Sequence, residues 1–415
     1  MIETSTARRV AAAVDGERLL ARLSELAQIG ADPLGGVTRI AFTELECQAN
    51  ELVIGWLLEL GLTVSADTFG NLFGSTDGNA ADGAPWLAGS HLDTVPNGGK
   101  LDGALGVVAA VEALAAMRTA DALPEQPLEI VIWRCEEPVR FAQGKVGSLL
   151  FSHALGRDQL TVLAGDDLDL ARPPARTELP SRPDTRRVAG CLELHIEQGR
   201  RLERAGRRLG VVTAVASPIR LRVLVAGRSD HSGATPMDDR QDALCAAAEL
   251  ALVVESAAHA EAEYETVATT ARISVEPGAM NVVPGHAELL VDVRGTEGES
   301  MRRVVGEIEG SAARVAAARD VDIDVQTLSR AEPTRFDPDI VAVLSDTVAA
   351  LDEEPMLMPS GAGHDAQCIA SLAPAGMLFV PSVGGVSHSP LEHTADDDVI
   401  LGARALAGAW ATVAG

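Results

Sequence analysis

Two apolar, strand-like runs enclose one long helical pattern, and this order constrains the fold more than any other feature. Residues 86–92 read WLAGSHL, residues 106–118 read GVVAAVEALAAMR, and residues 128–135 read LEIVIWRC. Runs that are apolar throughout are typical of strands covered on both faces. Because strand-like and helical runs alternate in this way over residues 1–210, the sequence predicts an α/β sheet with covered faces.

A second pattern occupies residues 215–330. Its runs follow the order β-α-β-β-α-β, which is the ferredoxin-like pattern. After it the chain returns to α/β-like material, so the segment reads as an insertion in a discontinuous domain made of residues 1–214 and 331–415. The six runs are residues 219–227, 239–259, 266–275, 286–294, 299–320 and 321–329.

Imidazole and carboxylate side chains stand where strand-like runs end. Three histidines with several carboxylates form a mixed nitrogen and oxygen set, which suits Zn, Mn, Co or Ni better than Cu(I) or an iron–sulfur cluster. Two adjacent glutamates can have different roles, since one can ligate metal while the other accepts and returns a proton. The candidates are His91 and Asp102 in GSHLDTVPNGGKLDG, Glu136 and Glu137 in LEIVIWRCEEP, His195 in LELHIEQG, and His388 in VGGVSHSPLEHT.

Two further inferences concern His91. Asp93 follows it by two residues and is placed to accept the other N–H of its ring, the supporting contact that metal-bound histidines usually have. For His388 to reach His91 and Asp102, the segments before and after the insertion must form one metal-binding catalytic domain.

Many short motifs in one order carry a family resemblance that runs nearly end to end. The chain resembles the hydantoinase/carbamoylase branch of the M20 metallopeptidase family, which holds N-carbamoyl-L-amino acid hydrolases, β-ureidopropionases and allantoate amidohydrolases. The resemblance implies an α/β catalytic domain and a smaller lid, residues 215–330, that also dimerises. The motifs are GGVTRIAFT, GNLFG, GSHLDTV, GGKLDGALGV, CEEPVRF, HIEQG, DHSGATPM, NVVPG, VDVRG, SGAGHDA and FVPSVGGVSHSPLEHT.

The resemblance also implies two divalent metal ions per subunit that share one carboxylate. Glu136 would be the general base, next to a glutamate that ligates metal. The implied ligands are Asp102 as the bridge, His91 and His195 on one metal, and Glu137 and His388 on the other.

A polar set would bind the substrate, again by resemblance. A carbonyl under attack needs an electrophilic partner, and His231 can provide it, so His231 counts as catalytic as well. A substrate carboxylate needs a fork such as Arg294, whose plainer interpretation is a surface charge at a strand end. Lid residues of this family often reach the partner subunit's site, which implies a homodimer. The implied substrate-binding residues are Gln198, His231, Asn281, Arg294 and Gly363; His364 would support the turn at Gly363.

One motif departs from the family pattern. Members of this branch typically have three acidic residues and then Gly-Ser-Arg-Phe, where this chain has CEEPVRF. Both functional glutamates are kept, but Cys135 replaces the first acid and Pro138 stiffens the strand exit. The substrate can therefore differ from the usual carbamoyl amino acid.

Composition excludes several partners. The formal net charge of -26 argues against nucleic acid and anionic membranes. The N-terminus lacks a signal-peptide pattern, and no apolar run is expected to reach membrane-spanning length. Five scattered cysteines without a C-x-x-C pair predict free thiols and, by default, a reducing cytoplasm.

These observations lead to one function and several alternatives. The leading hypothesis is a binuclear-metal amidohydrolase acting on a small ureido or amide carboxylate, in its most concrete form an N-carbamoyl-L-amino acid or β-ureidopropionate. Allantoate or a related ureide is the nearest alternative, followed by an N-acyl amino acid or dipeptide. Loss of Glu136 or of a metal ligand would favour a non-catalytic scaffold or a metal-storage protein. Every one of these residues is present, so the sequence favours an enzyme.

Overall fold

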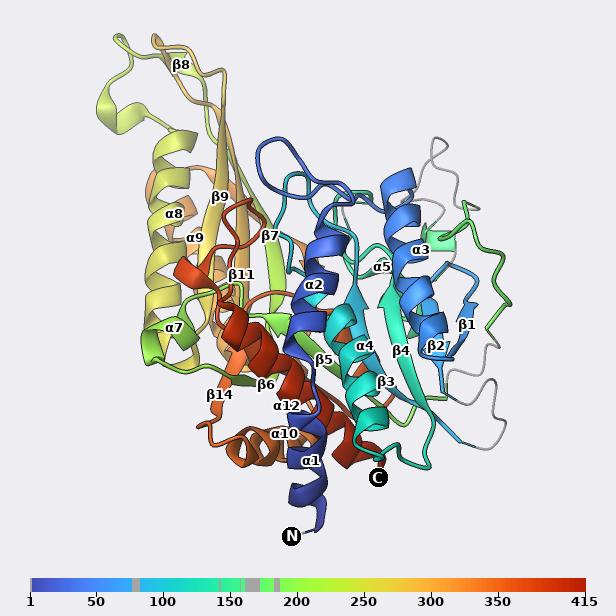
Figure 1. The fold of residues 1–415 in the computed structure, drawn as a ribbon. Helices are drawn as coiled ribbons and strands as arrows, with labels where there is room; N and C mark the ends of the chain where they lie inside the picture. The colour runs from blue at the N-terminus through green and yellow to red at the C-terminus, as the bar shows by residue number, and fades with distance from the viewer. Residues whose placement is uncertain (1, 77–82, 142, 157, 161–171, 183–186) are drawn as a thin grey trace. The chain divides into compact units, whose positions relative to one another are not determined.

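The protein divides into two compact units, which we describe separately. The computed structural model describes residues 2–76, 83–141, 143–156, 158–160, 172–182 and 187–415 (Figure 1). Unit 1 is formed by Met1–Thr213 with Phe336–Gly415, and unit 2 by Ala214–Arg335. Unit 1 is therefore assembled from both ends of the chain.

The sheet of unit 1 has parallel strands at its centre. β3, β4, β5 and β15 lie side by side in the order β4-β3-β5-β15 and all run in the same direction. Every residue of these four strands is buried, as expected for apolar runs covered on both faces. The predicted α/β class is confirmed. The strands of unit 1 are β1 (Thr63–Ala66), β2 (Leu72–Ser75), β3 (Trp86–His91), β4 (Leu128–Trp133), β5 (Gly190–Ile196), β6 (Gly210–Val215), β14 (Met356–Ser360) and β15 (Ala375–Val380). The last two residues of β6 fall in unit 2, where they pair with β13 (Thr334–Arg335).

Helix α4 (Ala104–Thr119) is the central helix of unit 1 and is buried from Ala104 to Met117. It packs against β3 and α12, and small residues allow the close approach, because a Cβ at Gly106 would lie 2.5 Å from the Leu194 carbonyl oxygen. The approach holds the first turn of α4, which follows Asp102, beside the ends of β3 and β5. The other helices are α1 (Ile2–Ala12), α2 (Gly16–Ala27), α3 (Glu44–Glu59), α5 (Val146–Phe151), α7 (Arg201–Ala205), α10 (Pro338–Ala350), α11 (Asp365–Ile369), η3 (Val383–Gly385) and α12 (Asp396–Ala414).

Unit 2 is a four-stranded antiparallel sheet with two long helices. The sheet order is β12-β7-β11-β9, and buried and less buried residues alternate along β7 and β11. Helices α8 and α9 bury one face each in the same apolar core (Figure 1). The elements are β7 (Ser217–Ala226), β8 (Asp230–His231), η1 (Met237–Asp239), α8 (Ala243–Ala260), η2 (Ala262–Tyr264), β9 (Val267–Glu276), β10 (Val282–Val283), β11 (His286–Gly295), α9 (Gly298–Arg319) and β12 (Asp322–Arg330).

Helix α8 is more apolar than the sequence analysis expected. It is 18 residues long with a mean hydropathy of 1.4, so by length and composition it is the one helix among the described residues that could cross a membrane. One face, which includes Leu250 and Val254, is nevertheless buried in the core of unit 2. About one third of the helix is buried, so α8 packs with one face against the sheet and leaves the other exposed.

Candidate metal centre

The parallel strands bring the predicted ligands to one edge of the unit 1 sheet. His91 is the last residue of β3, His195 is the penultimate residue of β5, and Glu136 follows β4 by three residues. His388 lies in the segment after β15. Because parallel strands end at the same edge, segments far apart in the sequence meet there.

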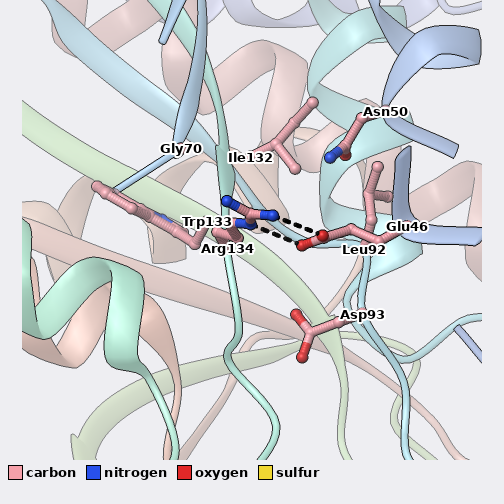
Figure 2. Close-up of a pocket in the computed structure, with 8 residues that line it drawn as sticks. All are labelled: Glu46, Asn50, Gly70, Leu92, Asp93, Ile132, Trp133 and Arg134. Atoms are coloured by element: carbon pink, nitrogen blue, oxygen red, sulfur yellow. Dashed lines mark hydrogen bonds and ion pairs between the residues drawn. The ribbon is translucent and has the colours of Figure 1, made fainter. Parts of the chain in front are cut away.

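A small cavity lies behind this edge, and it is not a substrate site. Its lining includes Asp93 and the buried ion pair of Arg134 with Glu46, whose atoms are 3.0 Å apart (Figure 2). Its volume of about 10 Å³ accommodates roughly one water molecule. The Arg134 guanidinium also stacks 3.8 Å from the centre of the Phe42 ring. The residues around this cavity therefore stabilise the segment that follows β4.

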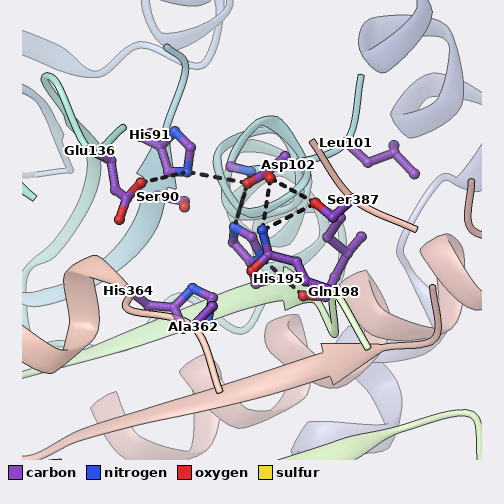
Figure 3. A network of polar contacts seen from close by, with 12 residues as sticks. Ser90, His91, Leu101, Asp102, Glu136, His195, Gln198, Ala362, His364 and Ser387 are labelled. Carbon is purple, nitrogen blue, oxygen red and sulfur yellow. Dashed lines mark hydrogen bonds and ion pairs between the residues drawn. The ribbon is translucent and has the colours of Figure 1, made fainter. Parts of the chain in front are cut away.

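Two candidate metal clusters share Asp102, and each uses a different oxygen of it. Oδ1 lies 3.5 Å from Nε2 of His91 and 3.2 Å from Nε2 of His195 (Figure 3). Oδ2 lies 3.3 Å from Nε2 of His388, which is 3.2 Å from a Glu137 carboxylate oxygen. In both clusters the donor atoms lie close enough together to hold a metal ion. All five predicted ligands are thus brought together.

The two buried histidine rings are oriented by main-chain carbonyls. Nδ1 of His91 lies 3.0 Å from the carbonyl oxygen of Asp93, and Nδ1 of His195 lies 3.0 Å from that of Ile196. A carbonyl can only accept, so each Nδ1 carries a proton and each Nε2 faces Asp102, to which the charged ring donates a hydrogen bond. Loss of the Nε2 proton would leave the tautomer that a metal requires.

Asp93 supports the site in a different way from the one expected. Its carboxylate accepts the main-chain N–H groups of Glu136, at 3.1 Å, and Glu137, at 3.0 Å. The carboxylate oxygen nearest to Nδ1 of His91 is 3.7 Å away, so the ring N–H goes to the carbonyl instead. Burial raises the pKa of Asp93 to about 6. Asp93 therefore fixes the segment that carries both glutamates.

We expect Asp93→Asn to destabilise this segment, because the amide would turn one acceptor into a donor facing a main-chain N–H. The predicted loss is about 1–3 kcal/mol of unfolding free energy, measured by denaturant titration. The exposed Asp397→Asn is the matched control. Equal stability of the two variants would contradict the supporting role of the Asp93 carboxylate.

Electrostatics affect the carboxyl groups of Asp102 and Glu136 in opposite directions. Burial raises the pKa of Glu136 well above its usual range, although His91 opposes the shift. Burial acts on Asp102 in the same direction, but hydrogen bonds from His195, His388 and His91 hold its pKa well below the usual range. Asp102 thus remains a carboxylate, whereas Glu136 readily holds a proton.

Glu392 was not predicted and holds the bridging segment. One of its oxygens accepts the main-chain N–H groups of Leu101, at 3.0 Å, and Asp102, at 3.1 Å, and the other accepts the Ser387 hydroxyl. A Cβ at Gly99 would collide with it, at 1.9 Å. The only sequence signal was a glutamate four residues after His388, which reads as a surface residue.

The unit 1 residues expected to bind substrate lie at the centre's rim. Gln198 donates its amide to Asp102 Oδ2, at 2.8 Å, and has a left-handed backbone with φ of 58°. Gly363 lies in the turn between β14 and α11, next to His364, whose ring centre is 4.6 Å from that of His195. His364 is buried and bonds Ser360, so it supports the turn.

A third group of potential ligands, Glu193, His195 and His364, has its donor atoms occupied. Glu193 accepts the Ser90 hydroxyl, at 2.7 Å, and the Ala366 N–H, at 2.8 Å. His364 keeps its bond to the Ser360 hydroxyl, at 2.9 Å, and burial lowers its pKa well below the usual range. We interpret this group as a buried polar support.

The other expected residues lie in unit 2. Nδ1 of His231 accepts the N–H groups of Gly233, at 3.1 Å, and Ala234, at 3.2 Å, so Nε2 carries the proton and points outward as a donor. Asn281 lies beside this turn, since its carbonyl accepts the Ser232 N–H at 3.0 Å. His231 ends β8 and Asn281 directly precedes β10, so both residues lie at one end of this small ribbon.

Arg294 is already engaged within unit 2. Its Nε and Nη2 contact the two carboxylate oxygens of Asp292, at 2.7 and 3.3 Å. A carboxylate ligand would have to compete with this pair.

A family model described as peptidase family M20/M25/M40 matches residues 87–412. The chain belongs to peptidase family M20. It falls in the hydantoinase/carbamoylase branch, whose solved members it matches throughout. An amidase of this branch from Burkholderia ambifaria has a TM-score of 0.87 and 34% identity, with 98% of each chain covered.

Curated relatives of this M20 protein are enzymes. An N-carbamoyl-L-amino acid amidohydrolase of Geobacillus stearothermophilus is 38% identical over 399 residues, covering 95% of this chain and 97% of that protein. A ureidoglycolate hydrolase of Oryza sativa subsp. japonica is 33% identical over 411 residues, covering 96% and 84%. The M20 protein described here is accordingly a metal-dependent hydrolase of carbon–nitrogen bonds other than peptide bonds.

Proposed function

We propose that this protein is a binuclear-metal amidohydrolase that cleaves a ureido or amide C–N bond of a small carboxylate substrate. The observation that carries the proposal is the arrangement of Asp102, whose two oxygens each face a separate cluster of ligands. An N-carbamoyl-L-amino acid or β-ureidopropionate is the substrate we propose first, with the amino acid, ammonia and carbon dioxide as products.

Asp102 would bridge the two metals. When bound, such a metal pair polarises the carbonyl and makes a nucleophilic water available near neutral pH. The raised pKa of Glu136 suits a general base, which takes a proton and returns it to the departing nitrogen. The ligands would be His91 and His195 on one side of Asp102, and Glu137 and His388 on the other.

The residues expected to contact substrate would be Gln198, Gly363, His231, Asn281 and Arg294. Gln198 and Gly363 lie at the rim of the metal centre, where they can position the ureido group and the substrate backbone. The Nε2–H of His231 is a donor for the oxyanion that forms during attack, with Asn281 beside it. Arg294 would exchange Asp292 for the substrate carboxylate.

Unit 2 would be a ferredoxin-like lid that also dimerises. Two observations support this: β9 is an edge strand with exposed Val267 and Ile273, and the outer face of α8 exposes Leu244 and Leu252. An unpaired strand edge beside an exposed apolar helix face is a surface on which a second copy of the chain can pack. We expect light scattering on a sizing column to give twice the mass of the chain. A monomeric mass would contradict this.

Two alternatives remain in the same class. Allantoate or a related ureide is the first, because a ureidoglycolate hydrolase and allantoate deiminases are among the relatives. An N-acyl amino acid or dipeptide is the second. Cys135 is buried beside Glu136 with a left-handed backbone, so the strand exit differs from the family pattern where the base is held.

Turnover by the metal-reloaded protein tests the proposal. The apo protein would be loaded with Zn, Mn, Co or Ni and given N-carbamoyl-L- and D-amino acids, β-ureidopropionate, allantoate and N-acetyl amino acids. Ammonia release from one ureide, dependent on two metals per chain, is the expected result. Cleavage of acetylated substrates alone, detected by an amine assay, would contradict the ureide assignment.

All five cysteines are free, which agrees with a cytoplasmic location.

A further inference from the structure

Lys145 stands beside the metal centre and has no role in the function described so far. The sequence contains two lysines, Lys100 and Lys145, so a matched comparison between them is possible. Lys145 is half-buried and precedes helix α5. It has φ of 60° and ψ of 31°, a left-handed backbone that is uncommon for residues other than glycine and asparagine.

The backbone at Lys145 is hydrogen-bonded to the segment after β4 that carries the proposed base. Its N–H donates to the Glu136 carbonyl at 2.6 Å, and residues 146–147 donate to the carbonyls of residues 134–135 at 3.0 Å. The Lys145 backbone therefore has a fixed position relative to Glu136.

The side chain of Lys145 reaches the turn at Gly363. Its Nζ donates to Oε1 of Gln367 at 2.6 Å, and a Cβ built on Gly363 would lie 2.7 Å from Nζ. The same turn places His364 next to His195, as Figure 3 shows. Lys145 thus bonds the segment of the general base through its backbone N–H and reaches the turn expected to bind substrate with its ammonium group.

The ammonium has spare capacity. It can donate three hydrogen bonds, and among the described residues its Nζ has Gln367 as its hydrogen-bond partner and forms no ion pair with a carboxylate. A half-buried cation of this kind attracts an anion, and an anionic substrate approaching a chain of net charge -26 needs a local positive group.

We propose that Lys145 binds a carboxylate of the substrate from within unit 1. The inference rests on the proposed function and adds a specificity determinant to it. The carboxylate is either the α-carboxylate, shared with the Gly363 turn, or a second one on an acidic side chain. This contact adds to the one proposed for Arg294, whose guanidinium must first release Asp292.

Binding to a base-dead protein tests the proposal without turnover. In metal-loaded Glu136→Gln, calorimetry would compare N-carbamoyl-L-alanine, its amide and N-carbamoyl-L-aspartate, with and without Lys145→Met. We expect Lys145→Met to weaken binding of the acids about 10- to 100-fold and to leave the amide unchanged. An equal loss for both acids assigns the α-carboxylate, and a larger loss for the aspartate derivative assigns the second one.

Lys100→Met is the matched control, since Lys100 is exposed, and it should leave all three affinities unchanged. Equal loss for the acids and the amide, or no loss at all, would overturn the proposal while the ureidase function stands. If no ureide binds to Glu136→Gln or is cleaved by the unsubstituted protein, the proposed function fails and this inference fails with it.

Discussion

Replacing Glu136 with Gln should lower kcat by roughly 100-fold or more while metal binding is retained. The amide has nearly the same shape as the carboxyl but cannot take up and return the proton. Glu136 lies 3.8 Å from Nε2 of His91. Of the two adjacent glutamates, Glu137 belongs to a ligand cluster and Glu136 does not. Burial raises the pKa of Glu136, so the group can take up a proton near neutral pH. The loss of kcat would therefore reflect the loss of proton transfer.

The measurement is ammonia release with the best ureide, together with metal content. Glu309→Gln on the exposed side of α9 is the matched control and should keep full turnover. Turnover of Glu136→Gln within a few-fold of the unsubstituted protein would remove Glu136 as the base. Loss of metal in the same variant would instead make it a ligand.

Replacing Asp102 with Asn should weaken metal binding at least about 100-fold and abolish two-metal stoichiometry. The reason is that both clusters depend on this side chain, through Oδ1 on one side and Oδ2 on the other. An amide offers one neutral oxygen, so it cannot neutralise and bridge two cations. Metal content after dialysis and calorimetric titration of the apo protein would measure the loss.

Asp397→Asn is again the control for an exposed aspartate, and a melting curve would show whether the fold persists. Retention of two tightly bound metals by Asp102→Asn would rule out the bridge. Loss of one metal only would mean that Asp102 serves a single cluster, and the assignment of the other cluster to His388 and Glu137 would need revision.

Three residues at the centre were readable from the sequence because each lies at the end of a recognisable run. His91, Glu137 and His195 follow apolar strand patterns, and parallel strands bring their ends to one edge whatever the details of packing. The same patterns predicted the α/β class correctly. Local pattern was sufficient because burial on both faces selects apolar residues continuously along a strand.

The supporting contacts were decided only by the tertiary structure. Asp93 could have bonded the His91 ring, but the approach of β4 to β3 brings two main-chain N–H groups to its carboxylate. Glu392 reaches Asp102 across about 290 residues of sequence, and Lys145 reaches Gln367 across about 222.

The sequence by itself therefore determined which side chains are available for metal and proton chemistry. The tertiary structure decided which oxygen of Asp102 faces which histidine, and which buried carboxylates hold the ligand segments in place. The physical reason is that ligand identity is a property of single residues in short patterns. Hydrogen bonds such as that of Glu392 depend on distances of a few tenths of an ångström between segments that meet only after folding.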